Sequence, residues 1–135
     1  MPQLEEFCSL DLRLSIDMVG KVPRGLRLDF PFQGVATSPH WEGERPVSGV
    51  DYATFRGDGN MSLDLHGRIG EGDQVVAYRG SGVSIVPERG VAEPRELIEF
   101  ETAWEELAFL NTMLGIGIGR GEGESLRLTI YLVRP

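Results

Sequence analysis

Several side chains that can move protons lie close together in the middle of this 135-residue sequence. Asp51, Asp64 and His66 can each accept or donate a proton, and Arg56 can bind an oxyanion or a carboxylate. Buried carboxylates near one another acquire different pKa values, so one can act as an acid while another acts as a base. We predict these four as catalytic residues for proton transfer on a carbonyl compound. The alternative is that they form the solvated face of a sheet.

Other kinds of chemistry lack the residues they need. His40 and His66 are the only imidazoles and Cys8 is the only thiol, which leaves no three-histidine or multi-cysteine metal site. A mixed site of His66, Asp64 and a distant acid is a minor alternative. The glycine run at 115–121 fits neither a phosphate loop nor a dinucleotide fingerprint, and no G-x-S-x-G motif occurs. We therefore expect neither a metal nor another cofactor.

Hydrophobic side chains alternate with polar ones along most of the chain, which is typical of half-buried strands. The clearest case is 9–16, where Leu10, Leu12 and Leu14 share one face. Residues 26–32 resume the alternation after a connector at 19–25, and these two segments are expected to pair. Residues 43–49 are predicted as another connector. Further strands are expected at 50–55, 61–68, 74–78, 83–86, 97–101 and 126–133, with a second hairpin across the turn at 57–60.

One short helix is expected at 103–110, with Thr102 as its N-cap. The alternating glycines at 115–121 indicate a strand where another chain segment comes close. About eight to ten strands from one small chain must protect their edges, which favours an all-β antiparallel barrel over a sandwich. The length predicts a single domain over residues 1–135.

Composition limits the partners. Thirteen basic and 21 acidic side chains give a net charge of -8, which disfavours nucleic acid. No apolar run is long enough to span a bilayer, and the first residues do not resemble a secretion signal, so we expect a cytoplasmic protein that does not bind membranes.

A set of short motifs in a fixed order resembles the bacterial and fungal family called domain of unknown function 3237. The matching segments are Val19-Gly20, Pro23, Gly25, Arg27, Gly49-Val50-Asp51-Tyr52, Arg56, Asp58-Gly59, Leu63-Asp64 and Phe109-Leu110-Asn111. The resemblance implies a small β-barrel and no particular activity. The sequence departs from the family pattern at Tyr52, Ser48, His66, Gly67 and Phe109. Glycine in place of an aromatic residue at Gly67 is expected to open space for a ligand.

Three hypotheses about function follow. The first is a cofactor-independent isomerase, cyclase or lyase that acts on a small, largely apolar or aromatic carbonyl compound in a barrel pocket. The second is a barrel that binds such a compound without catalysis, and the third is an interaction module that forms a homodimer. Residues expected to contact the ligand are Arg27, Tyr52, Asp58, Tyr78, Trp104 and Asn111.

Overall fold

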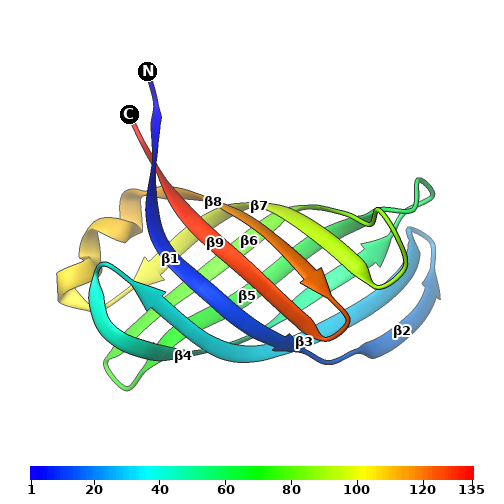
Figure 1. Cartoon of the computed structure of the whole chain (residues 1–135), viewed down its shortest axis with the longest axis horizontal. Coiled ribbons are helices and arrows are strands. Elements are labelled where there is room, and N and C mark those ends of the chain that lie inside the picture. Colours follow the sequence, from blue (N-terminus) through cyan, green and yellow to red (C-terminus); the bar gives the residue numbers. More distant parts are fainter.

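The computed structural model describes residues 1–135, which form one antiparallel sheet that closes on itself (Figure 1). Its elements are β1 (Gln3–Leu14), β2 (Asp17–Val22), β3 (Gly25–Ser38), β4 (Trp41–Phe55), β5 (Met61–Glu71), β6 (Gln74–Ile85), β7 (Val91–Thr102), the 3-10 helix η1 (Glu105–Thr112), β8 (Leu114–Glu122) and β9 (Ser125–Arg134). The strand order is β1-β9-β8-β7-β6-β5-β4-β3-β2, and a pairing of β1 with β3 closes the barrel. The predicted antiparallel barrel is confirmed.

The closing seam joins the two alternating segments that the sequence pairs. β1 lies antiparallel to the second half of β3, from Ser9 opposite Thr37 to Leu14 opposite Phe32. β2 then continues along the first half of β3. Pro31 lies where β1 gives way to β2, and its carbonyl oxygen accepts the N–H of Ser15 at 2.9 Å. The missing N–H of proline is tolerated because the ladder is interrupted there.

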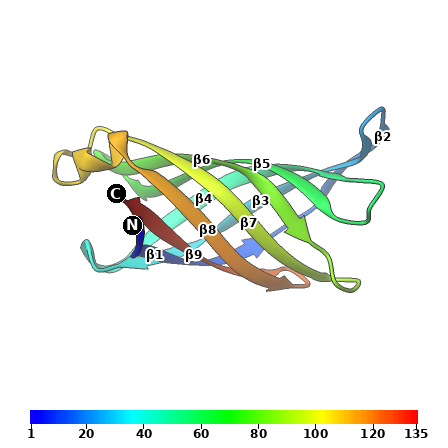
Figure 2. The same cartoon turned by 90° about the horizontal axis from the view of Figure 1, so that it is seen from above.

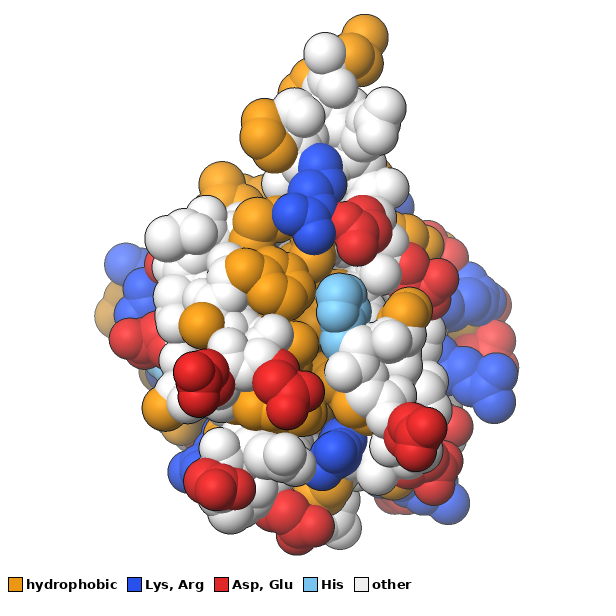
Figure 3. All heavy atoms as spheres, turned by 90° about the vertical axis from the view of Figure 1, so that its left-hand side faces the viewer, with side chains coloured by type: hydrophobic (Ala, Val, Ile, Leu, Met, Phe, Trp, Pro, Cys, Tyr) orange, Lys and Arg blue, Asp and Glu red, His pale blue; other side chains and the backbone are white.

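One end of the barrel is filled and closed. Phe7, Trp41 and Trp104 belong to the main cluster of 20 buried hydrophobic residues, together with Leu107 and Leu110 of η1. The helix crosses this end in both ribbon views (Figures 1 and 2). Viewed onto the same end, hydrophobic side chains occupy the centre and charged ones surround them (Figure 3). The lumen is therefore closed at this end.

The helix differs slightly from its predicted form. It is a 3-10 helix over Glu105–Thr112 and starts two residues later than expected. Its N-cap is Trp104 rather than the predicted Thr102, whose hydroxyl oxygen instead accepts the N–H of Trp104 at 3.0 Å. No helix of the chain is long and apolar enough to cross a bilayer.

Three segment boundaries were predicted wrongly. Residues 43–49 are part of β4 rather than a connector, most of 19–25 belongs to β2 and β3, and 83–85 continue β6 instead of forming a strand of their own. Glycine content suggested turns at 43–49. At Gly49, however, glycine is required within a strand, because a Cβ there would overlap the ring of Phe32 and the backbone of β5.

Candidate active site in the barrel lumen

The lumen contains a cavity of about 250 Å³ that reaches the surface at the end away from η1. An engineered cavity of roughly 150 Å³ holds benzene, so this volume accommodates a small organic molecule. Most lining residues are hydrophobic, and the few polar side chains that line the cavity are Asp51 of β4, Tyr78 and Ser84 of β6, and Glu96 of β7. An apolar pocket with a few polar groups is typical of a ligand site.

Glu96 is the most unusual of these residues. It is only 5% exposed, and its Oε1 has no hydrogen-bond partner. Its direct neighbours across the sheet are Gly82 on β6 and Gly117 on β8, neither of which offers a side chain to bind it. Burial raises the pKa of Glu96 well above its ordinary value, and the nearby Asp51 raises it further. Burial therefore favours the neutral form of the carboxyl, which can donate a hydrogen bond to a ligand.

The glycine run of β8 makes room for this carboxyl. Gly115, Gly117, Gly119 and Gly121 alternate on the strand and all face the lumen. A Cβ at Gly117 would come within 3.0 Å of Oε1 of Glu96 and of Cδ1 of Ile98. The expectation that another segment approaches these glycines closely is confirmed.

Asp51 lines the same cavity from β4, which β5 and β6 separate from β7. The pairing of β4 with β5 skips from Asp51 and Leu65 to Thr54 and Ser62, and Oδ1 of Asp51 accepts the N–H of Asp64 at 3.2 Å within this gap. Burial raises the pKa of Asp51 from 3.8 to about 6; the backbone hydrogen bond opposes this rise and the charge of Asp64 adds to it. Asp51 is therefore mostly ionised at neutral pH, whereas burial favours the protonated form of Glu96.

Tyr78 lies over Gly67. A Cβ at Gly67 would overlap the phenol ring, so glycine at this position accommodates Tyr78 instead of leaving empty space. The predicted opening at Gly67 is therefore filled on the lumen side, but Gly67 also lines a hollow on the outer surface with Tyr52, His66 and Asn111. Tyr78 is 4% exposed, and burial followed by the charge of Glu96 raises the pKa of its hydroxyl well above its ordinary value. The phenol stays protonated and can donate a hydrogen bond.

The other two predicted proton carriers lie outside the barrel. β5 turns Met61, Leu63 and Leu65 inward, so Asp64 and His66 point outward. Their side chains are 65% and 53% exposed, and Nε2 of His66 lies 3.4 Å from Oδ1 of Asp64. The structure thus places Asp51 and Tyr78 in the lumen, whereas Asp64 and His66 lie beside each other on the outer side of the barrel.

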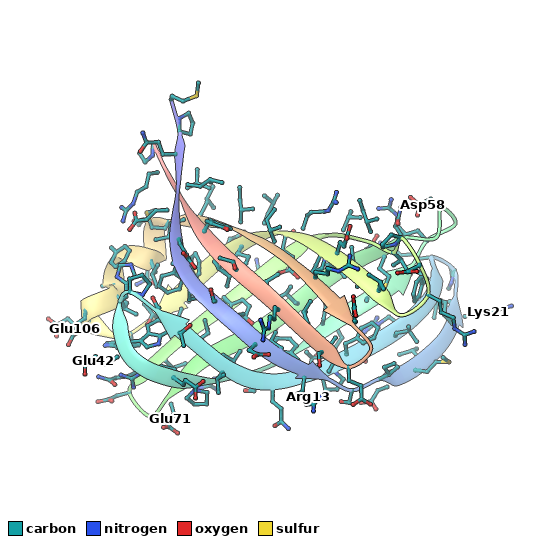
Figure 4. The ribbon with its side chains drawn as sticks, in the orientation of Figure 1. Arg13, Lys21, Glu42, Asp58, Glu71 and Glu106 are labelled. Atoms are coloured by element: carbon teal, nitrogen blue, oxygen red, sulfur yellow. The ribbon has the colours of Figure 1, made fainter.

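Four further predicted residues form two pairs away from the lumen. Arg56 binds Asp58 in the β4–β5 loop, with Nε and Oδ1 3.2 Å apart. Figure 4 shows Asp58 at the tip of this loop, beside the open end. Arg27 lies over the ring of Tyr52, 5.2 Å from its centroid, on the outer wall. None of the four lines the lumen.

Trp104 and Asn111 have positions at the closed end. Trp104 is 6% exposed and packs against Trp41, with ring centroids 6.0 Å apart. The amide of Asn111 binds the backbone of Thr102 twice: Oδ1 accepts its N–H at 2.8 Å, and Nδ2 donates to its carbonyl oxygen at 3.0 Å. Asn111 thereby fixes η1 to β7, with Leu110 fully buried beside it.

Glu96 was not among the predicted site residues, although the sequence contains a signal for it. Glu96 shares the alternating phase of Ile98 and Phe100, which are buried, so a carboxyl lies on the apolar face of β7. Starting the strand at Leu97, which is 69% exposed, obscured this phase. An acid in phase with the buried face of a strand is the pattern that identifies it.

The raised pKa of Asp51 predicts how stability changes with pH. The folded protein holds this proton more tightly than the unfolded chain, so the free energy of unfolding falls as pH rises from about 4 to 6. Asparagine does not ionise, so Asp51→Asn removes this loss of stability at higher pH. The variant should be more stable than the wild type by about 2–3 kcal/mol at pH 7.5 and by little at pH 4. Thermal unfolding at both pH values measures this difference.

Asp58→Asn is the matched control, because Arg56 lowers the pKa of Asp58 to about 2. This substitution should destabilise the protein at neutral pH, which is the opposite of the effect expected for Asp51→Asn. An Asp51→Asn variant that is less stable than the wild type at pH 7.5 would contradict a raised pKa of Asp51 in the folded protein.

No group of three or more histidine, cysteine, aspartate or glutamate side chains is arranged to hold a metal ion. Cys8 is free and 1% exposed, and burial raises the pKa of its thiol far above the ordinary value. The lumen groups are therefore limited to two carboxyls, a phenol and the hydroxyl of Ser84.

The sequence matches a family model described as "Protein of unknown function (DUF3237)" over residues 2–133. No curated protein matches the chain. A protein of unknown function from Clostridium acetobutylicum has a similar structure, with a TM-score of 0.86, 18% identity and coverage of 99% of this chain and 100% of that one. A β-barrel-like protein from Acinetobacter baumannii has a TM-score of 0.84 and 16% identity, with coverage of 99% of this chain and 97% of that one.

A protein described as an enzyme, from Penicillium herquei, has a TM-score of 0.68 and 16% identity, with coverage of 98% of this chain and 95% of that one. At these identities the likeness concerns the fold.

Proposed function

This chain belongs to the family of proteins of unknown function DUF3237, and from its lumen we propose that it is a cofactor-independent acid-base enzyme. Its substrate is a small, largely apolar or aromatic carbonyl compound. The observation that carries the proposal is the pair of lumen carboxyls, Asp51 and Glu96, which are held in different protonation states with no cation beside them. Such a separation is typical of an acid and a base that work together.

The proposed step begins with the substrate carbonyl oxygen accepting a hydrogen bond from the neutral carboxyl of Glu96. The Asp51 carboxylate removes a proton from the carbon next to the carbonyl. The electrons of that C–H bond form a carbon–carbon double bond, and the carbonyl π electrons move to the oxygen, to which Glu96 transfers its proton as general acid. Tyr78 is a second donor in the same lumen.

The resulting enol can then follow one of three routes. Return of the proton to a different carbon gives isomerisation, attack on an electrophilic carbon of the same molecule gives cyclisation, and expulsion of a leaving group gives elimination. All three need only a proton carrier and an oxyanion donor. The similarity to a fold neighbour described as an enzyme supports catalysis in general but favours none of these routes.

Proton exchange tests the proposal without the natural substrate. We expect the wild-type protein to accelerate the replacement of α-hydrogens by deuterium in small cyclic and aryl ketones, such as 1-indanone and 2-tetralone, in D₂O. The rate should rise from pH 5 to pH 7 as Asp51 ionises, since its pKa is about 6. NMR follows the loss of the α-hydrogen signal.

Binding of these ketones without any acceleration would contradict the enzyme and favour the second candidate, a barrel that binds such compounds without catalysis. The observation that favours this alternative is the apolar lumen itself. A homodimer also stays a proposal. The outer wall of β7 and β8 exposes Leu97, Leu114 and Ile118, which offer an apolar surface to a second copy.

A further inference from the structure

The apolar lining of the lumen does not stop at its mouth. Ile16, in the bend between β1 and β2, lines the cavity and is also 62% exposed. Its side chain is therefore shared by the interior of the barrel and the surface outside the mouth. An exposed side chain of this size that is continuous with a ligand cavity indicates that the binding surface extends outward.

β2 carries the apolar surface further. It pairs only with β3, and the β2–β3 hairpin projects at the open end, as the β4–β5 loop also does (Figures 1 and 2). Met18 lies directly opposite Leu28, a residue that lines the lumen. Side chains directly opposite on antiparallel strands point to the same side of the sheet, so Met18 extends the lumen face. Met18 is 67% exposed and is free to contact a ligand.

Charge restricts the ligand. The ionisable groups that line the cavity are Asp51, Tyr78 and Glu96, and no lysine, arginine or histidine lines it. An anion that entered would lose its hydration without gaining a positive partner. Lys21, in β2 near the tip of the hairpin, is exposed and points away from the barrel (Figure 4). The lumen is therefore suited to an uncharged molecule.

We propose that the lumen ligand is an uncharged compound with a polar oxygen at one end and an apolar body longer than the lumen, whose far end lies against Ile16 and Met18. This inference rests on the proposed function in one respect, because the oxygen faces Glu96. The remaining apolar body fills the lumen and emerges at the mouth along β2.

A series of 2-alkanones from 2-hexanone to 2-undecanone tests the length requirement by isothermal titration calorimetry. Each added methylene that becomes buried should strengthen binding by about fourfold, and this gain should continue for chains that reach beyond the mouth. Met18→Ser should leave the affinity of the short ketones unchanged and weaken binding of the longest ones by about five- to tenfold. Leu4→Ser in β1, where Leu4 is 58% exposed near the end of the barrel away from the mouth, is the matched control and should leave the ketone affinities unchanged.

Decanoate tests the charge requirement. At pH 8 it should bind at least about 30-fold more weakly than 2-undecanone, whose chain is similar in length. Equal affinities for the two would overturn the requirement for an uncharged ligand. Absence of binding throughout the ketone series would overturn the whole inference.

Two results would overturn the role of β2. One is that Met18→Ser affects short and long ketones equally or not at all. The other is that it changes the sedimentation coefficient, which would mean that Met18 contacts a second copy of the chain. Failure of the proposed function looks different: the ketone series would bind with the expected dependence on Met18, but no α-hydrogen would exchange.

Discussion

Glu96→Gln is expected to lower the rate of α-hydrogen exchange by about 10²- to 10⁴-fold, the usual contribution of a general acid or base. Glutamine has nearly the same shape and still donates hydrogen bonds through its amide, but it cannot transfer a proton to the enolate oxygen. The ketone should still bind, because the apolar walls of the lumen are unchanged. Exchange followed by NMR at pH 7, with binding measured in parallel, separates the two effects.

Asp51→Asn should cause a loss of similar size and also remove the rise in rate between pH 5 and pH 7. The matched controls are Asp64→Asn and His66→Gln, which change the exposed pair on the outer side of β5. Both should retain exchange within about twofold, since surface substitutions away from a site have small effects. A loss in these controls as large as in Glu96→Gln would transfer the chemistry to the outer wall.

Gly34→Ala is expected to destabilise the barrel by about 3 kcal/mol or more. Gly34 of β3 lies opposite Leu12 of β1 in the closing seam. A Cβ at Gly34 would overlap the carbonyl oxygen of Asp11 and come within 2.9 Å of the Cα of Leu12, both of which are backbone atoms. The strands must separate to admit the methyl group, and the hydrogen bonds that close the barrel weaken. Urea unfolding measures the loss.

Gly57→Ala is the control for this prediction. A methyl group added at Gly57 would have no other atom within 4 Å, and Gly57 has no positive φ, so alanine fits there without strain. Its free energy of unfolding should stay within about 0.5 kcal/mol of the wild type. Similar stabilities for the two variants would mean that β1 and β3 do not pack as closely as described.

The fold could be predicted from the sequence because alternation records which face of a strand is buried. Leu10 and Leu12 of β1 are buried as their spacing predicts, and the pairing of this segment with β3 is confirmed. The same alternation also predicts which way the side chain of Asp64 points. Since Met61, Leu63 and Leu65 face inward, a residue at an even number between them must face the solvent.

Half of the polar residues of the lumen were among the predicted site residues. Asp51 and Tyr78 were identified, whereas Glu96 required the correct phase of β7. The filling of the space at Gly67 could not be predicted, because Tyr78 reaches it from the neighbouring strand and the direction of its ring depends on tertiary packing. The gap between β4 and β5 at Asp51 likewise has no local sequence signal.

The two ends of the chain leave the barrel together. Gln3 pairs with Arg134 at the start of β1 and the end of β9, and Nε of Arg134 binds Glu5 at 2.6 Å. This two-stranded ribbon projects near the end that η1 closes, away from the mouth (Figure 1). A tether attached at either terminus therefore holds the protein with its lumen opening toward the solution. Because the termini are adjacent, a short peptide can also join them, and new ends can be placed in an exposed loop without cutting the seam of the barrel.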